Sequence, residues 1–197
     1  MKVMCVLTAS EVETDNPDII VFPEGVDVQE IDQAQLFNPN AIIIGAIAEH
    51  GCDPECPQMR GMLRHEDSKN KVEYLKVETD GRTKGSSDTK QSPIYEFDDV
   101  CIGLLICMDI ENIAFSKMVI DKIISSPAKL KLLCVPADMG SEWLGGDNLP
   151  GKFKGVYVIL CNHSRTHESR YKSFIADIHG RKIRVQNDEE SICEVLP

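Results

Sequence analysis

A cysteine and a glutamate each stand at the end of an apolar run in this sequence. Cys107 follows Gly103-Leu104-Leu105-Ile106, and a helical pattern begins at Glu111. A thiol at such a strand-to-helix turn lies beside backbone N–H groups that have no intrahelical partner and that stabilise a thiolate. We therefore predict that Cys107 is a nucleophile.

The glutamate is Glu24, which ends the apolar run that begins at Asp18. Cleavage of an amide C–N bond, or addition to a nitrile, requires a nucleophile, a proton carrier and a positive charge near the developing anion. Glu24 is the candidate general base, which would take the thiol proton, return it to the leaving amine and then activate water. A cation has to supply the third function.

Four segments resemble, in order, the motifs of the nitrilase, or carbon–nitrogen hydrolase, superfamily. They are Val21-Phe22-Pro23-Glu24, the run from Gly103 to Asp109, Cys161-Asn162-His163-Ser164, and the run from Ser173 to Gly180. The resemblance covers nearly the whole chain. It implies an α/β fold, a nitrilase-like α-β-β-α sandwich of two stacked mixed sheets flanked by helices. It also implies a Glu-Lys-Cys triad that works without a cofactor or a metal.

The triad lysine has several candidates, because Lys69, Lys71, Lys76, Lys84 and Lys90 all lie between the two anchors. In the resembling family the lysine ends the returning strand of a hairpin, opposite an asparagine. A hairpin that turns near Asp80-Gly81 would bring Lys90 opposite Asn70. We expect Lys90 to be the triad lysine, with Lys84 as the alternative.

Three further residues are given roles. The backbone N–H of Met108, next to the nucleophile, is expected to be the second donor to the developing anion. Trp143 follows a buried strand where the resembling family lines its pocket, although core packing is an equal alternative. Asp109 is expected to cap the following helix. No counterpart of the family's second, substrate-positioning glutamate is evident between Lys90 and Cys107.

The sequence therefore predicts a thiol hydrolase that acts on a small amide, carbamoyl compound or nitrile through a covalent cysteine adduct. The alternative is a catalytically weak or inactive binding or scaffold protein of the same fold. A redox-sensing thiol protein is a third interpretation, suggested by eight cysteines but without a C-x-x-C pair.

Composition limits the kinds of partner that we expect this protein to bind and the cellular location that we expect for it. The 197 residues carry a formal net charge of −11, which argues against nucleic acid and anionic membranes as partners. The apolar start, Met1 to Leu7, is too short for a signal peptide, and no run is long enough to span a membrane, so we expect a cytoplasmic protein.

Most cysteines lie in strand-like runs, where free buried thiols are expected. Cys52 and Cys56, near His50 and His65, leave zinc as a minor alternative.

Periodicity predicts the elements of a single domain over residues 1–197. Buried strands are expected at 1–8, 18–23, 41–47, 130–135 and 156–161, strands with one wet face at 58–65 and 71–78, and further strands at 93–97, 100–107, 173–178 and 182–185. Helices are expected at 28–37 and 111–124, the second with Ile113, Met118, Ile120, Ile123 and Ile124 inward. By analogy with the family, this second helix is a candidate surface for a homodimer.

Overall fold

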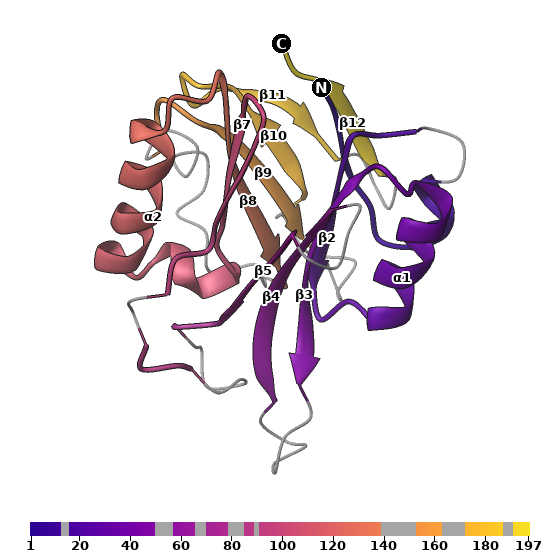
Figure 1. Cartoon of the computed structure of the whole chain (residues 1–197), viewed down its shortest axis with the longest axis horizontal. Helices are drawn as coiled ribbons and strands as arrows, with labels where there is room; N and C mark the ends of the chain where they lie inside the picture. Colours follow the sequence, from indigo (N-terminus) through magenta and orange to yellow (C-terminus); the bar gives the residue numbers. More distant parts are fainter. Residues whose placement is uncertain are drawn as a thin grey trace.

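Two sheets stack face to face, and one α-helix covers the outer face of each (Figure 1). The α/β sandwich predicted from the sequence is therefore confirmed. This computed structural model describes residues 1–12, 16–49, 57–65, 70–78, 85–88, 91–138, 153–162, 172–186 and 191–197. Strands β2 and β3 of the first sheet contact β8 and β9 of the second, so the main core lies between the sheets.

The first sheet has the strand order β12-β1-β2-β3-β4-β5. Strands β1, β2 and β3 are parallel, β12 and β4 pair antiparallel to them, and β5 pairs antiparallel to β4. The strands are β1 (Lys2–Cys5), β2 (Ile19–Glu24), β3 (Ile42–Glu49), β4 (Gln58–His65), β5 (Asn70–Leu75) and β12 (Ile192–Val195). A short 3-10 turn, η1 (Ala9–Val12), follows β1.

Helix α1 (Val28–Phe37) packs on the outer face of this sheet. The Asp27 side chain caps the helix by accepting a hydrogen bond from the Gln29 N–H at 2.9 Å. Ile31 and Ala34 are its buried residues, and they pack against Ile20 and Phe22 of β2. The bounds of α1 agree with the helix predicted from the sequence.

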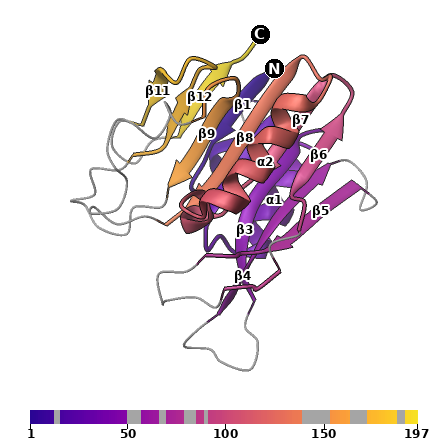
Figure 2. The same cartoon turned by 90° about the vertical axis from the view of Figure 1, so that its left-hand side faces the viewer.

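The second sheet has the order β11-β10-β9-β8-β7-β6, and again its parallel strands lie inside. The strands are β6 (Ile94–Phe97), β7 (Val100–Leu104), β8 (Leu130–Ala137), β9 (Tyr157–Asn162), β10 (Phe174–Ala176) and β11 (Lys182–Val185). A 3-10 turn, η2 (Cys107–Ile110), and helix α2 (Ile113–Ser125) follow β7. Figure 2 shows α2 lying over β7 and β8.

Strand β12 brings the two termini together (Figure 1). The Met1 ammonium donates to the Leu196 carbonyl at 2.7 Å, and the Leu196 N–H donates to the Met1 carbonyl at 2.8 Å. The sequence interpretation did not include this strand. Its short alternating run, Ile192-Cys193-Glu194-Val195, gains its pairing only from a segment at the other end of the chain.

The buried face of α2 differs from the prediction. Phe115, Val119 and Ile123 are buried, whereas Ile113 is 81 % exposed and Ile124 is 44 % exposed. The reason is a close approach at Gly103 of β7, where Val119 and Ile123 fill the space that a side chain would occupy. This contact fixes the rotation of the helix.

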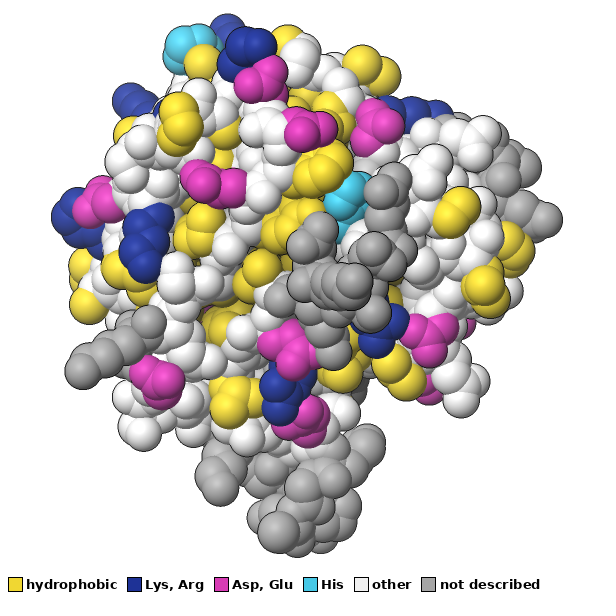
Figure 3. All heavy atoms as spheres, viewed as in Figure 1, with side chains coloured by type: hydrophobic (Ala, Val, Ile, Leu, Met, Phe, Trp, Pro, Cys, Tyr) yellow, Lys and Arg dark blue, Asp and Glu magenta, His cyan; other side chains and the backbone are white. Residues whose placement is uncertain are grey.

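Charges of both signs are interspersed over the face in Figure 3. Among the described residues, Arg64 pairs with Asp32 and Lys129 with Asp99. Neither of the two α-helices in the described part of the chain is long and apolar enough to cross a membrane.

The Gly103 contact predicts a local packing test. A Cβ on Gly103 would overlap Ile123 Cδ1 and lie 2.9 Å from Val119 Cγ1, so Gly103→Ala should lower the free energy of unfolding by about 1–3 kcal/mol. Ile123→Val removes the clashing methyl group, so the double variant should lose less than the sum of the two single losses. Urea denaturation of all four proteins measures this, and strict additivity would contradict it.

Candidate active site

Glu24 reaches the inner face of the first sheet because β2 is irregular at its end. Ile19 and Val21 face the second sheet, and Ile20 and Phe22 face α1, so simple alternation would turn residue 24 toward α1. The pairing register shifts between Val21 and Glu24, at Pro23, which has no N–H for the ladder. Glu24 is thereby paired with Ala46, an inner-face residue, and is only 6 % exposed.

Cys107 lies in a strained turn at the end of the strand segment from β7. Its φ is 44°, in the left-handed region that residues with a side chain rarely adopt. The chain continues as the 3-10 turn η2, and α2 begins only at Ile113. The thiol is therefore not at the N-terminus of an α-helix, and that part of the sequence interpretation was wrong.

Lys76 is the lysine that the structure brings to Glu24. Its Nζ lies 2.6 Å from Glu24 Oε1, and the two side chains are 3 % and 6 % exposed. Lys76 directly follows β5, two residues after the buried Tyr74, so both side chains face the second sheet. Its backbone N–H donates to the Met59 carbonyl at 2.9 Å, and its carbonyl accepts from the Ser86 N–H at 2.7 Å.

The Cys107 thiol shares this site with the ion pair. Burial raises the pKa of Cys107 well above its ordinary value, and the charge of Glu24 raises it further. Lys76 and the backbone N–H of Asp138, which hydrogen-bonds the sulfur, act in the opposite direction. The thiol also hydrogen-bonds the Glu24 side chain. Cys107 is thus a neutral thiol at neutral pH, with a carboxylate in place to receive its proton.

Lys76 remains a cation in this setting. Desolvation by burial lowers the pKa of its ammonium, but the charge and hydrogen bond of Glu24, together with the charges of Cys107 and Asp109, raise the pKa above the ordinary value. The site therefore combines a buried thiol, a carboxylate that can accept a proton and a permanent positive charge.

Asp109 was predicted to cap the following helix, but it does not. Asn112 caps α2, since its side chain accepts a hydrogen bond from the Phe115 N–H at 3.0 Å. The Asp109 carboxylate is completely buried. It accepts hydrogen bonds from the Tyr74 hydroxyl at 2.9 Å and from the backbone N–H groups of Val77 and Glu78 at 2.8 and 2.6 Å.

The other predicted site residues divide into two groups. Met108 is half-buried in η2, directly after the nucleophile. Lys90, Lys84 and Trp143 lie outside the described residues. Asn70 pairs with His65 of β4 on one edge of its strand, and the predicted pairing of Asn70 with Lys90 stays a prediction because Lys90 lies outside the described residues.

The signal that could have singled out Lys76 is the alternation of its own strand. Val72, Tyr74 and Lys76 occupy successive positions on one face, and the first two pack into the core. A lysine that continues a row of core residues must be buried, and a buried lysine requires an anionic partner. The Asp109 contacts have no such signal, because they join segments about thirty positions apart.

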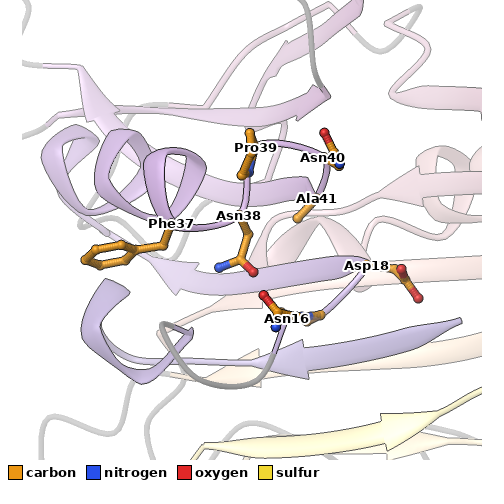
Figure 4. A pocket seen from close by; sticks show the side chains of 8 residues that line it. Asn16, Asp18, Phe37, Asn38, Pro39, Asn40 and Ala41 are labelled. Carbon is orange, nitrogen blue, oxygen red and sulfur yellow. The ribbon is translucent and has the colours of Figure 1, made fainter.

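Other parts of the described chain do not form a second site of this kind. A cavity of about 230 Å³ lies between Asp18 and Ala41, at the amino ends of β2 and β3 (Figure 4). It is at the opposite end of β2 from Glu24. Within the described residues there is no cluster of metal-ligating side chains, and Cys52 and Cys56 lie outside them. His65 hydrogen-bonds Tyr95 at 3.1 Å and packs against Phe97.

Comparison with known proteins shows the class of fold. No protein family model matches the sequence, and no curated protein is significantly similar to it. Among solved structures, Nit3 of Saccharomyces cerevisiae, a member of branch 10 of the nitrilase superfamily, is 16 % identical with a TM-score of 0.71; the match covers 98 % of this chain and 89 % of Nit3. The chain therefore has the nitrilase-superfamily fold, as the sequence motifs predicted.

Two further solved structures have the same fold. A CN-hydrolase superfamily protein of Xanthomonas campestris, solved with an arsenic adduct in its active site, is 13 % identical with a TM-score of 0.73 over 98 % of this chain and 89 % of that chain. The NitFhit protein of C. elegans is 14 % identical with a TM-score of 0.62 over 98 % of this chain and 60 % of that chain. At these identities the likeness describes the fold.

The buried ion pair predicts a double-variant effect. Lys76→Met leaves the Glu24 carboxylate buried without a counter-charge, which should cost about 3–5 kcal/mol of unfolding free energy. Adding Glu24→Gln removes the uncompensated charge, so the double variant should be more stable than Lys76→Met alone. Urea denaturation at pH 7 measures both, and a double variant less stable than Lys76→Met would contradict the pairing.

Proposed function

We propose that this protein is a thiol hydrolase that cleaves a non-peptide carbon–nitrogen bond of a small amide, carbamoyl compound or nitrile. The proposed triad is Glu24, Lys76 and Cys107. The observation that carries the proposal is the buried contact of 2.6 Å between Lys76 Nζ and Glu24 Oε1, in a site whose charges act on the Cys107 thiol. Lys76 takes the role that the sequence motifs assigned to Lys90.

Formation of the adduct begins with proton transfer. The Cys107 thiol gives its proton to the Glu24 carboxylate as the sulfur attacks the electrophilic carbon. Electron density moves to the carbonyl oxygen, or to the nitrile nitrogen. The Lys76 ammonium and the Met108 backbone N–H are the proposed donors to that atom.

Breakdown of the adduct uses the same carboxyl group. For an amide, protonated Glu24 gives its proton to the departing amine, and the C–N bond breaks to leave a thioester on Cys107. Glu24 then takes a proton from water as the hydroxide attacks the thioester carbon. The C–S bond breaks, Glu24 returns this proton to sulfur to regenerate the thiol, and a carboxylic acid leaves. No external oxidant or reductant enters this cycle.

The raised pKa of Cys107 explains why a base is needed. A thiol that stays protonated at neutral pH is a poor nucleophile by itself. A carboxylate hydrogen-bonded to it removes the proton only as the carbon–sulfur bond forms. Because Lys76 keeps its charge, the proton released by sulfur is passed to Glu24, and the ammonium is available to stabilise the anion.

The central prediction concerns the identity of the reactive sulfur. Incubation with a panel of small amides, carbamoyl compounds and nitriles, followed by mass spectrometry, should give an adduct on Cys107. Cys107→Ala should abolish both the adduct and turnover. Cys101→Ala is the matched control and should retain both, because Cys101 is a fully buried thiol of β7 on the same face as Gly103, which packs against α2.

Two results would contradict the proposal. Unchanged turnover in Cys107→Ala would exclude Cys107 as the nucleophile. Iodoacetamide labelling of Cys107 no faster than that of the other thiols, with no adduct from any compound of the panel, would favour a non-catalytic protein that kept the fold.

A further inference from the structure

The residues around Asp109 form a second buried network beside the ion pair. Asp109 is two positions after Cys107, and its carboxylate is completely buried. The three groups that donate hydrogen bonds to this carboxylate all come from the chain segment of Tyr74 to Glu78, which carries Lys76. Asp109 thus joins the lysine segment to the nucleophile turn.

Tyr74 extends the network to the residue before the nucleophile. Its hydroxyl donates to Asp109 and accepts the backbone N–H of Ile106. The tyrosine ring lies over Gly61 of β4, where a Cβ would come within 2.5 Å of the ring edge. The glycine therefore allows the ring to lie deep enough for its hydroxyl to reach between Ile106 and Asp109.

We propose that Asp109 is a positioning residue, whose charged carboxylate fixes the Lys76 segment against the turn that carries Cys107. The proposal rests on the triad proposed above. Oδ1 accepts the two N–H groups that directly follow Lys76, so loss of this acceptor frees the backbone on one side of the lysine. A displacement of about 1 Å in a catalytic group is enough to reduce a rate on the order of 100-fold.

The charge of Asp109 is sensitive to pH in the neutral range. Desolvation by burial raises the pKa of Asp109 to about 6, although hydrogen bonds from Glu78, Tyr74 and Val77 and the charge of Lys76 oppose the shift. Tyr74 and Lys76 reach the carboxylate from the β5 segment, with Glu78 beside them. Among the described residues, Glu24 of β2 and Cys107 of η2 are the other titratable groups of the site.

The groups around Asp109 determine whether lowering the pH strengthens or weakens its hydrogen bonds. Above pH 6 the carboxylate is charged and accepts all three hydrogen bonds. Below pH 6 it becomes a carboxylic acid, whose carbonyl oxygen is a weaker acceptor for the two N–H groups and whose O–H has to be accepted by the Tyr74 hydroxyl, which then no longer donates to it. The lysine segment should therefore be held firmly above pH 6 and released below it.

The test compares two variants with the wild type over pH 5–8. Asp109→Asn should slow iodoacetamide labelling of Cys107 on the order of 100-fold at pH 7.5, and the ratio of the two rates should approach one below pH 6. Taking the ratio cancels the intrinsic pH dependence of the thiol. A ratio that is constant with pH would mean a merely structural role and would overturn the proposal.

Tyr74→Phe is the second variant, and it keeps the ring. Because the tyrosine hydroxyl lowers the pKa of Asp109, its removal should move the midpoint of the labelling profile to higher pH. Tyr95→Phe is the matched control, since Tyr95 is a buried tyrosine of β6 whose hydroxyl contacts His65. It should leave the midpoint unchanged, and an unmoved midpoint in Tyr74→Phe would overturn the proposal.

A readout independent of reactivity separates this proposal from the proposed function. In protein labelled with carbon-13 aspartate, the Asp109 carboxyl signal, assigned by its loss in Asp109→Asn, should titrate near pH 6 and at higher pH in Tyr74→Phe. This result is expected even if Cys107 proves unreactive, which would refute only the hydrolase. A carboxyl group that stays protonated above pH 7.5 would refute the positioning role of the charged form while leaving the hydrolase intact.

Discussion

The buried contact between Lys76 and Glu24 is the constraint on which the rest of the site depends. Two opposite charges are removed from water together, and each would be costly to bury without the other. Their proximity keeps the lysine protonated despite desolvation. The same low-polarity setting keeps the Cys107 sulfur protonated, so the resting site contains a neutral thiol and a charged ammonium. This arrangement suits attack by a thiol that loses its proton to a base during the reaction, and not attack by a thiolate formed beforehand.

The architecture explains how such a site is assembled. Glu24 and Lys76 come from the first sheet, whereas Cys107 and Asp138 come from the second. Each group stands at or just beyond the end of a strand, where the chain leaves the regular ladder. The irregularities are local and specific: Pro23 turns Glu24 inward, and the left-handed backbone at Cys107 ends the strand segment before α2. The hydrogen bonds of Asp109 and Tyr74 then join the segment that carries Lys76 to the turn that carries Cys107.

The fold could be predicted from the sequence to a large extent, because its signals are local. The helix at Val28–Phe37 and the strands at Gln58–His65 and Lys182–Val185 follow from apolar periodicity and turn residues. Glu24 and Cys107 could be proposed from their places after apolar runs, and they lie together in the structure. Both were also supported by motif order.

The remaining features depend on which strands pair, and this is not a local property. The pairing of β5 is one example: Asn70 to Leu75 pair with β4, and the inward row of side chains on this strand continues to Lys76, which meets Glu24 of the non-adjacent strand β2. Likewise, the inward face of α2 is set by the bare backbone of Gly103 on another element, and the role of Asp109 by donors from β5. Single-sequence periodicity contains none of these long-range contacts.

The division of the site between two sheets has a consequence for folding intermediates. A partly folded state could keep both sheets hydrogen-bonded and still let them slide or separate, because backbone ladders form within each sheet. In such a state the sulfur and the carboxylate would be apart, although spectroscopic strand content would be near native. Selective reactivity at Cys107 would therefore report docking of the two layers, a property that secondary-structure probes do not detect.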